Sequence, residues 1–285
     1  MPIKKVLRTE GFEERCERYK EKINNYTIMN DIFMRNVFKK KECVEYILQV
    51  IMSKKDLQII EQILQKDYKN LQGRSAVLDC VARDETKRQF NVEIQGEDEG
   101  ASPKRARYHS GLLDMNTLNP GEPFDNLPET YIIFITRNDV LGYNRAICHI
   151  NRKVEEENEP FKDEAHIIYV NSKKQEDTEL GRLMHDLHCK KASDMYSKIL
   201  ASRVYKLKET EKGVREMCRD MEEIYSEGRE NGFEEGEQSG TEKANRKTVL
   251  ALHNMGMSED NILQVVEVSI EQIRAWIEEG LVTTR

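Results

Sequence analysis

Alternating apolar and polar positions predict a β-hairpin in the middle of the chain. Residues 75–95 hold two alternating segments, which a polar turn at residues 84–87 separates. One face of the hairpin then carries Asp79 from the first strand, with Glu93 and Gln95 from the second. The alternation assigns to the opposite faces the apolar side chains Leu78, Cys80 and Ala82 in the first strand and Phe90, Val92 and Ile94 in the second.

Helical spacing of apolar residues flanks this hairpin on both sides. Before it, the spacing predicts a helix that ends near Asn25, a helix over residues 31–52 and a short helix over residues 57–64. After it, Ser102 followed by Pro103 has the cap-then-first-turn order of a helix start. The inward face of that helix is expected to consist of Tyr108, Leu112 and Met115.

Two later segments are continuously apolar, at residues 131–136 and 166–170. Strands that are buried on both faces have this pattern. Together with the hairpin, they predict an α/β fold with a mixed sheet of four or more strands that helices flank.

The last third of the chain is helical and highly charged. After a long helix that reaches residue 224, glycine recurs at every fourth position, at Gly228, Gly232, Gly236 and Gly240. Each glycine in a helix interior costs about 1 kcal/mol relative to alanine, so the pattern favours a flexible linker over close helix pairing between protomers.

Residues 243–285 predict three short helices with Trp276 in their core. A helix-turn-helix DNA-binding module has a similar outline. However, residues 259–279 contain six acidic side chains and a single arginine, Arg274, and such a surface repels phosphate. We therefore expect a small bundle for homo-oligomerisation or partner contact.

The net charge of the chain limits how it could bind nucleic acid. The net charge of −7 excludes a globally basic coat, so any contact with nucleic acid must come from a local patch.

Six cysteines without CxxC pairs indicate reduced thiols. His185, His188 and Cys189 lack a second cluster at zinc-ligand spacing, which favours a polar helix face. An apolar leader or membrane span is also missing from the sequence, and we expect a cytoplasmic protein with no membrane partner.

Asp79 and Glu93 bring candidate chemistry to the hairpin. Hard divalent cations prefer oxygen ligands, and Mg2+ commonly takes one or two carboxylates, with water and substrate phosphate completing its shell. Gln95 lies two residues after Glu93 on the same face, where an amide could orient water or phosphate. The competing interpretation is an ordinary surface hairpin with polar side chains facing water.

Six segments occur in a distinctive order along the chain: NDIFMRNVF at 30–38, VLDCVARD at 77–84, NVEIQ at 91–95, KRARYHSGLL at 104–113, LPETYIIFITRNDVLG at 127–142 and HIIYVN at 166–171. In sequence and order they resemble the PD-(D/E)XK nucleases, and in particular their recombination-promoting nuclease and transposase family. The resemblance covers about residues 10–200.

The resemblance implies a restriction-endonuclease-like core and a metal-dependent DNA endonuclease that hydrolyses phosphodiester bonds. It makes Asp79 and Glu93 the ligands of Mg2+ or Mn2+ and Gln95 the third catalytic position, where most of the superfamily has lysine. An acid on the first core helix sometimes assists the metal, which leaves Asp31 either as an accessory acid or as a helix cap; the cap is the favoured interpretation.

On the first turns of the helix that follows the hairpin lie Lys104, Arg105 and Arg107, and we expect them to hold DNA phosphates. The alternative for these residues is a solvated cationic face. The predicted organisation is a nuclease-like domain at residues 1–200, a charged helix and glycine-rich linker at 201–243, and a helical module at 244–285. The alternative is a DNA-binding or assembly protein that keeps the fold but cleaves weakly or not at all. Two features favour it: Gln95, which cannot act as a base, and the acidic C-terminal tail.

Overall fold

The computed structural model describes residues 11–68, 76–96, 98–266 and 268–282. The chain divides into two compact units, Met1–Met221 and Glu222–Arg285. The division falls within helix α7 (Glu211–Asn254), whereas the sequence predicted boundaries at residues 200 and 243. It lies there because the first turns of α7 contribute Met217, Cys218 and Met221 to the core of the first unit.

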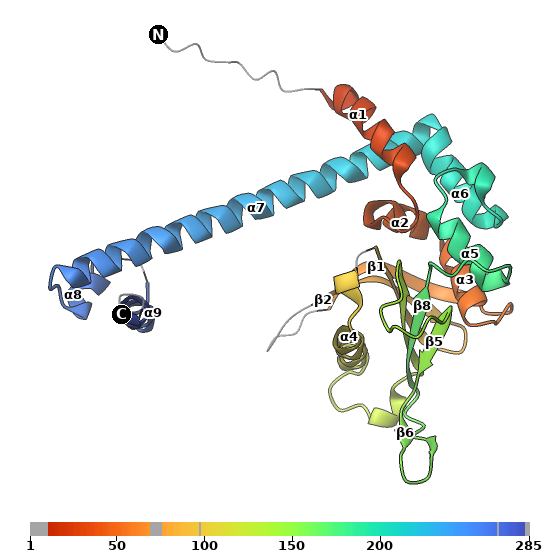
Figure 1. Ribbon diagram of the computed structural model, residues 1–285, viewed down its shortest axis with the longest axis horizontal. Helices are drawn as coiled ribbons and strands as arrows, with labels where there is room; N and C mark the ends of the chain where they lie inside the picture. Colours follow the sequence, from red (N-terminus) through yellow and green to blue (C-terminus); the bar gives the residue numbers. More distant parts are fainter. Residues whose placement is uncertain (1–10, 69–75, 97, 267, 283–285) are drawn as a thin grey trace. The chain divides into compact units, whose positions relative to one another are not determined.

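Six of the described strands form one mixed sheet, in the order β1-β2-β3-β4-β8-β5 (Figure 1). The pairs β1–β2, β2–β3 and β8–β5 are antiparallel, and β3–β4 and β4–β8 are parallel. The carboxyl ends of β3, β4 and β8 therefore share one edge. The strands are β1 (Ile59–Tyr68), β2 (Ala76–Asp84), β3 (Gln89–Gln95), β4 (Thr130–Thr136), β5 (Ile147–Ile150) and β8 (Ala165–Asn171).

Helices cover both faces of this sheet, as Figure 1 shows. One face packs against α1 (Phe12–Asn25), α2 (Asp31–Phe38), α3 (Lys41–Ile51), α5 (Glu179–His188), α6 (Lys198–Glu209) and the start of α7. The other face packs against α4 (Pro103–Met115). The central strand β4 supplies Ile133 to the first core and Phe134 to the second, which explains its continuous apolar sequence. This arrangement confirms the predicted α/β fold with a restriction-endonuclease-like core.

The predicted hairpin is present as β2 and β3, with Ser75 outside the described residues. Its second strand alternates as expected, but in its first strand Leu78 joins the α4 core, opposite to Cys80 and Ala82. The change of face occurs at Asp79, where the ladder to β3 ends. The prediction that these three side chains share one face was wrong.

Two predicted helices also differ from the structure. Residues 57–64 were expected to be helical, yet they run into strand β1, since pairing with β2 overrides an ambiguous apolar spacing. The predicted helix over residues 31–52 consists of α2 and α3, separated at Lys39 and Lys40.

Helix α4 begins as predicted, because the Ser102 hydroxyl accepts a hydrogen bond from the Arg105 backbone amide. Its inward face was predicted less well. Leu112 is buried, but Tyr108 and Met115 are exposed. The buried face instead includes Ala106 and His109.

The second unit has its own core, formed by α7, α8 (Glu259–Leu263) and α9 (Ile270–Val282). Trp276 is buried in it, as predicted. The four regularly spaced glycines lie within α7, so the segment that was expected to be a flexible linker is helical. A Cβ atom at any of these four glycines would meet no atom within 4 Å.

The expectation that all six cysteines are reduced was wrong. Cys16 of α1 and Cys218 of α7 form a disulfide, with their Cα atoms 5.4 Å apart. The two helices pack against each other in the first core, which brings together residues 202 positions apart. Cys43, Cys80, Cys148 and Cys189 are free.

Candidate active site

Strands β2 and β3 separate at Asp79 and Glu93. Their ladder ends at the pair Cys80–Val92, one position before these two acids. Beyond that point each carboxylate binds the backbone of the opposite strand: Glu93 Oε1 accepts from the Asp79 amide at 3.2 Å, and Asp79 Oδ2 accepts from the Ile94 amide at 3.3 Å. The two acids predicted to converge are therefore brought together, and side chains replace the ladder at this position.

Glu93 lies beneath α4 and is fully buried. Its Oε1 atom also faces His109 Nδ1 at 3.6 Å, and its Oε2 atom lies 3.8 Å from Arg105 NH2. Oε2 has no hydrogen-bond partner, and the buried His109 Nδ1 also lacks one. A carboxylate oxygen without a partner in a buried position is expensive unless a cation or donor meets it.

Asp79 receives additional support from the edge strand. Gln65 Nε2 donates to Asp79 Oδ1 at 3.3 Å. Gln65 lies in β1 between the residues that form the ladder pairs Leu64–Cys80 and Lys66–Leu78 with β2. The backbone φ of Gln65 is 49°. Such a conformation is uncommon for a residue other than glycine, and strain of this kind gathers at functional sites.

Burial and mutual repulsion perturb the titration of both acids. Burial, followed by the charge of the Asp31 carboxylate, raises the pKa of Asp79 to about 6. Burial, followed by the charge of Asp79, raises the pKa of Glu93 from its ordinary value of 4.5 to about 8. Burial lowers the pKa of His109 to about 4, so its ring is neutral near pH 7. Two acids that resist ionisation side by side are suited to share a cation.

Gln95 ends β3 and is partly exposed at the carboxyl edge of the parallel strands. Its backbone carbonyl accepts from the Arg137 amide at 3.1 Å. Its side-chain oxygen presses against Gly100, where an added Cβ atom would lie only 2.0 Å from Oε1. The absence of a side chain at Gly100 thus allows this position of the Gln95 amide.

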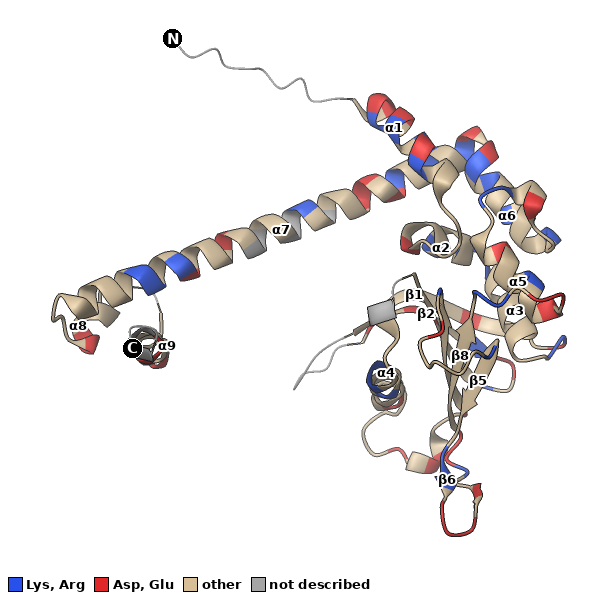
Figure 2. Cartoon of the chain, viewed as in Figure 1, with Lys and Arg blue, Asp and Glu red and all other residues tan. Residues whose placement is uncertain are grey.

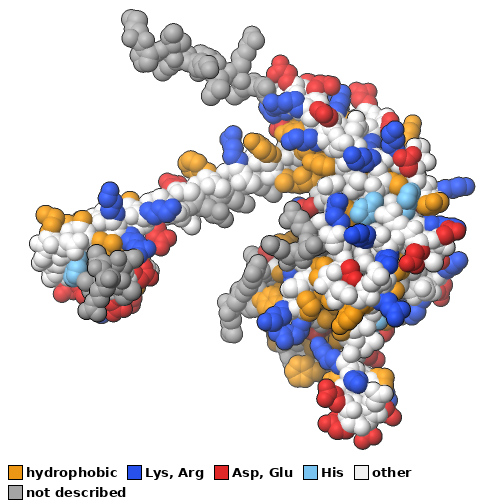
Figure 3. Space-filling view, in the orientation of Figure 1, with side chains coloured by type: hydrophobic (Ala, Val, Ile, Leu, Met, Phe, Trp, Pro, Cys, Tyr) orange, Lys and Arg blue, Asp and Glu red, His pale blue; other side chains and the backbone are white. Residues whose placement is uncertain are grey.

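The three basic residues predicted to bind DNA are divided by the helix that carries them. Arg105 turns toward Glu93, whereas Lys104 and Arg107 are exposed on α4, whose first turns are basic in Figure 2. Elsewhere on the face of the first unit seen in Figure 3, side chains of both charges are interspersed. The structure therefore brings only Arg105 of the three to the acid pair.

Asp31 is the first residue of α2 and not its cap. The N-cap position is occupied by Asn30, whose side chain makes no cap hydrogen bond. The Asp31 carboxylate instead binds Arg35 through both oxygens, at 2.9 and 2.6 Å. The favoured cap interpretation was wrong, and the effect of Asp31 on the pKa of Asp79 places its charge near the acid pair.

Residues 28–189 match the family described as PD-(D/E)XK nuclease family transposase. The chain belongs to this family. The match covers more than half of the chain and includes Asp79, Glu93 and Gln95. Comparisons with curated proteins and with solved structures found no match for this PD-(D/E)XK family member.

This PD-(D/E)XK nuclease-family protein has a second group of potential metal ligands, away from the acid pair in sequence. His185, Asp186 and Cys189 hold potential metal ligands within 4.8 Å of one another. Yet both carboxylate oxygens of Asp186 accept backbone amides, from Tyr196 and Ser197 at 2.8 Å. Asp186 thus anchors the segment that leads into α6. His188, for which the sequence favoured a polar helix face over a zinc site, lies against the Ser172 hydroxyl, with Nε2 and Oγ 2.8 Å apart.

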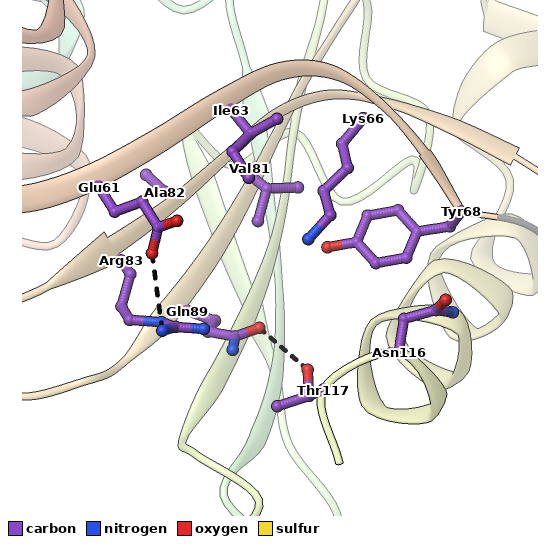
Figure 4. Close-up of a pocket in the computed structure, with 10 residues that line it drawn as sticks. All are labelled: Glu61, Ile63, Lys66, Tyr68, Val81, Ala82, Arg83, Gln89, Asn116 and Thr117. Atoms are coloured by element: carbon purple, nitrogen blue, oxygen red, sulfur yellow. Dashed lines mark hydrogen bonds and ion pairs between the residues drawn. The ribbon is translucent and has the colours of Figure 1, made fainter. Parts of the chain in front are cut away.

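A small cavity of about 80 Å3 lies on the α4 side of β1 and β2. Lys66 and Tyr68 project into it, and Gln89 and Thr117 close one side through a hydrogen bond (Figure 4). Neither Asp79 nor Glu93 lines this cavity, so it is separate from the acid pair.

Sequence reasoning missed His109 and Gln65. His109 follows Arg105 by one helical turn, so the two share a face, and this spacing was a signal for it. Gln65 had no such signal, because its strand was taken for a helix. In addition, the described residues contain no helix with the length and apolar character that crossing a membrane requires.

Proposed function

We propose that the chain is a metal-dependent DNA endonuclease that hydrolyses phosphodiester bonds during transposition or recombination. The observation that carries the proposal is the Oε2 atom of buried Glu93, which lies next to Asp79 and accepts no hydrogen bond. The family description supports the nuclease and transposase character.

The residues present fit a hard divalent cation. Asp79 and Glu93 would hold Mg2+ or Mn2+ through carboxylate oxygens, the donors that these ions prefer. When bound, such a cation supplies Lewis-acid polarisation of the phosphate and favours ionisation of water. Asp31, held by Arg35 near Asp79, is the candidate for an accessory acid.

The remaining side chains act on the substrate. Arg105, whose side chain is 41% exposed, offers a guanidinium to a phosphate oxygen near the acid pair. Gln95 orients water or phosphate through its amide, and it cannot remove a proton. Lys104 and Arg107 on the exposed side of α4 neutralise the DNA backbone farther along the strand.

The amide at Gln95 is the observation that favours a second candidate, a DNA-binding protein with weak or no cleavage. Both candidates use the same fold and the same basic helix. They differ in whether the wild-type chain breaks DNA when a divalent cation is supplied.

Nicking of supercoiled plasmid tests the proposal, with Mg2+ or Mn2+ present or removed by chelator. We expect Asp79→Asn and Glu93→Gln each to lower the nicking rate by at least about 100-fold. Loss of a residue that only supports a metal ligand costs up to about 100-fold, and loss of a ligand itself should cost at least as much. Glu61→Gln, on the exposed edge strand, is the matched control and should cleave as the wild type does.

Cleavage that survives both site substitutions would reject the site. A wild type that binds DNA but does not nick it with either ion would favour the binding protein.

A further inference from the structure

His109 is buried beside Glu93 and has no role in the proposed hydrolysis. Only 2% of its surface is exposed. Its ring lies between Arg105 on the same helix and Glu93 on β3, and it packs near Phe134, with ring centroids 5.8 Å apart. A buried imidazole with two polar neighbours raises the question of which nitrogen carries the proton.

Arg105 determines which nitrogen of His109 carries the proton. Its Nε–H group donates to His109 Nε2 at 3.3 Å. A guanidinium nitrogen has only hydrogens to offer, so Nε2 must accept with its lone pair. A ring that accepts at Nε2 carries its single proton on Nδ1. The protonated nitrogen is therefore the one that faces Glu93 Oε1 at 3.6 Å.

The two oxygens of Glu93 then have different surroundings. Oε1 accepts the Asp79 amide and faces the Nδ1–H group of His109. Oε2 has no hydrogen-bond partner, and Arg105 NH2 lies 3.8 Å from it. Nδ1 of His109 also has no hydrogen-bond partner, so it faces Oε1 at 3.6 Å without bonding to it. A closer approach of these two groups would place a second donor on Oε1 and leave the lone pairs of Oε2 to a cation.

We propose that His109 is a positioning residue: when Glu93 binds a divalent cation, the Nδ1–H group of His109 donates to Oε1 and so orients the carboxylate with Oε2 toward the cation. Arg105 fixes the tautomer by donating to Nε2. The inference rests on the proposed function, because it gives His109 a role only if Glu93 binds a metal. Partners of this kind behind a metal ligand commonly change metal affinity by about 10–100-fold.

Substitutions at His109 separate positioning from packing. In His109→Asn, the amide nitrogen takes the place of Nδ1 and keeps the donor, but the side chain is smaller. In His109→Leu, the bulk is kept and the donor is lost. Positioning requires the asparagine variant to bind metal better than the leucine variant, whereas packing requires the reverse order.

Mn2+ binding to the full chain, measured by calorimetry without DNA, gives the readout. We expect His109→Leu to weaken binding by about tenfold or more and His109→Asn to stay near the wild type. The matched control is His166→Leu, which removes a histidine 3.2 Å from the Glu129 carboxylate elsewhere in the fold and should leave Mn2+ affinity unchanged. Thermal unfolding of each variant verifies that it is folded.

Two outcomes overturn the inference alone: unchanged affinity in a folded His109→Leu protein, or leucine binding better than asparagine, while Glu93→Gln abolishes binding. Failure of the wild type to bind Mn2+, or full binding by Glu93→Gln, rejects the proposed metal site itself. Nitrogen-15 NMR of wild-type His109 provides a readout that needs no substitution. A proton on Nδ1 supports the inference, and a proton on Nε2 overturns it.

Discussion

Glu93 is a buried acid whose charged form the fold does not fully solvate. One oxygen accepts a backbone amide, and the other has no hydrogen-bond partner. Because burial and Asp79 raise its pKa, the folded chain holds a proton on this group that the unfolded chain would release. The residue therefore opposes folding when it is ionised and no cation is present.

The sign of the pH dependence follows from this shift. Between the ordinary pKa of 4.5 and the folded value of about 8, the folded state binds more protons than the unfolded state. The free energy of unfolding contributed by Glu93 is then highest at the acid end of this window and decreases as the pH rises through it. Asp79 adds a decrease of the same sign between its ordinary pKa of 3.8 and its folded pKa of about 6.

Glu93→Gln is expected to stabilise the metal-free protein by about 1–3 kcal/mol at the alkaline end of this window, because it removes a desolvated charge. Thermal unfolding in chelator, followed from acid to mildly alkaline pH, measures the difference. The gain should shrink at acid pH, and the exposed Glu61→Gln should show neither effect. A glutamine variant less stable than the wild type at alkaline pH would contradict this account.

At the scale of elements, two glycines of helix α7 differ in how closely a neighbouring element approaches them. Gly213, in the first turn of α7, lies against the backbone of α6, where an added Cβ atom would be 1.8 Å from the Lys206 carbonyl oxygen. Gly232, farther along α7, has open space around the same position. Helical spacing alone does not distinguish these two glycines, since the difference lies in the neighbouring element.

Gly232→Ala is expected to stabilise the second unit by about 0.5–1 kcal/mol, because alanine loses less backbone entropy in a helix. Gly213→Ala is expected to destabilise the first unit, since the backbone of α6 must move. Circular dichroism during thermal unfolding measures both. A decrease of helical signal or melting temperature in Gly232→Ala would show that this glycine is needed for close packing.

At the scale of the whole molecule, the first unit has a complete core without the second. Its buried apolar cluster ends at Met221, and the disulfide between Cys16 and Cys218 lies within it. The second unit has a separate cluster around Trp276. We therefore propose that metal binding belongs to the first unit, and we retain homo-oligomerisation through the C-terminal helices as a proposal for the second.

A chain that ends at residue 225 is expected to unfold cooperatively and to bind Mn2+ with the affinity of the full chain. Calorimetry and thermal unfolding measure these properties, and light scattering compares the masses. A smaller number of protomers in the truncated protein would support oligomerisation through the second unit. Loss of Mn2+ affinity in a folded truncated protein would contradict the assignment of metal binding to the first unit.

The sequence by itself determined the elements whose patterns are local. The alternation around Phe90, Val92 and Ile94 identified β3, and Ser102 with Pro103 identified the start of α4, because strand faces and helix caps depend on near neighbours. The acids Asp79 and Glu93 were predicted to converge for the same reason, since a hairpin fixes which positions lie opposite each other.

Only the tertiary structure decided what surrounds those acids. Burial of Glu93 requires α4 to pack over β3, and support for Asp79 requires Gln65 from an edge strand whose sequence resembles a helix. The pairing of Cys16 with Cys218 likewise depends on helices distant in sequence. Pattern along a chain reports local geometry, whereas desolvation and the partners of a charge arise only when distant segments pack together.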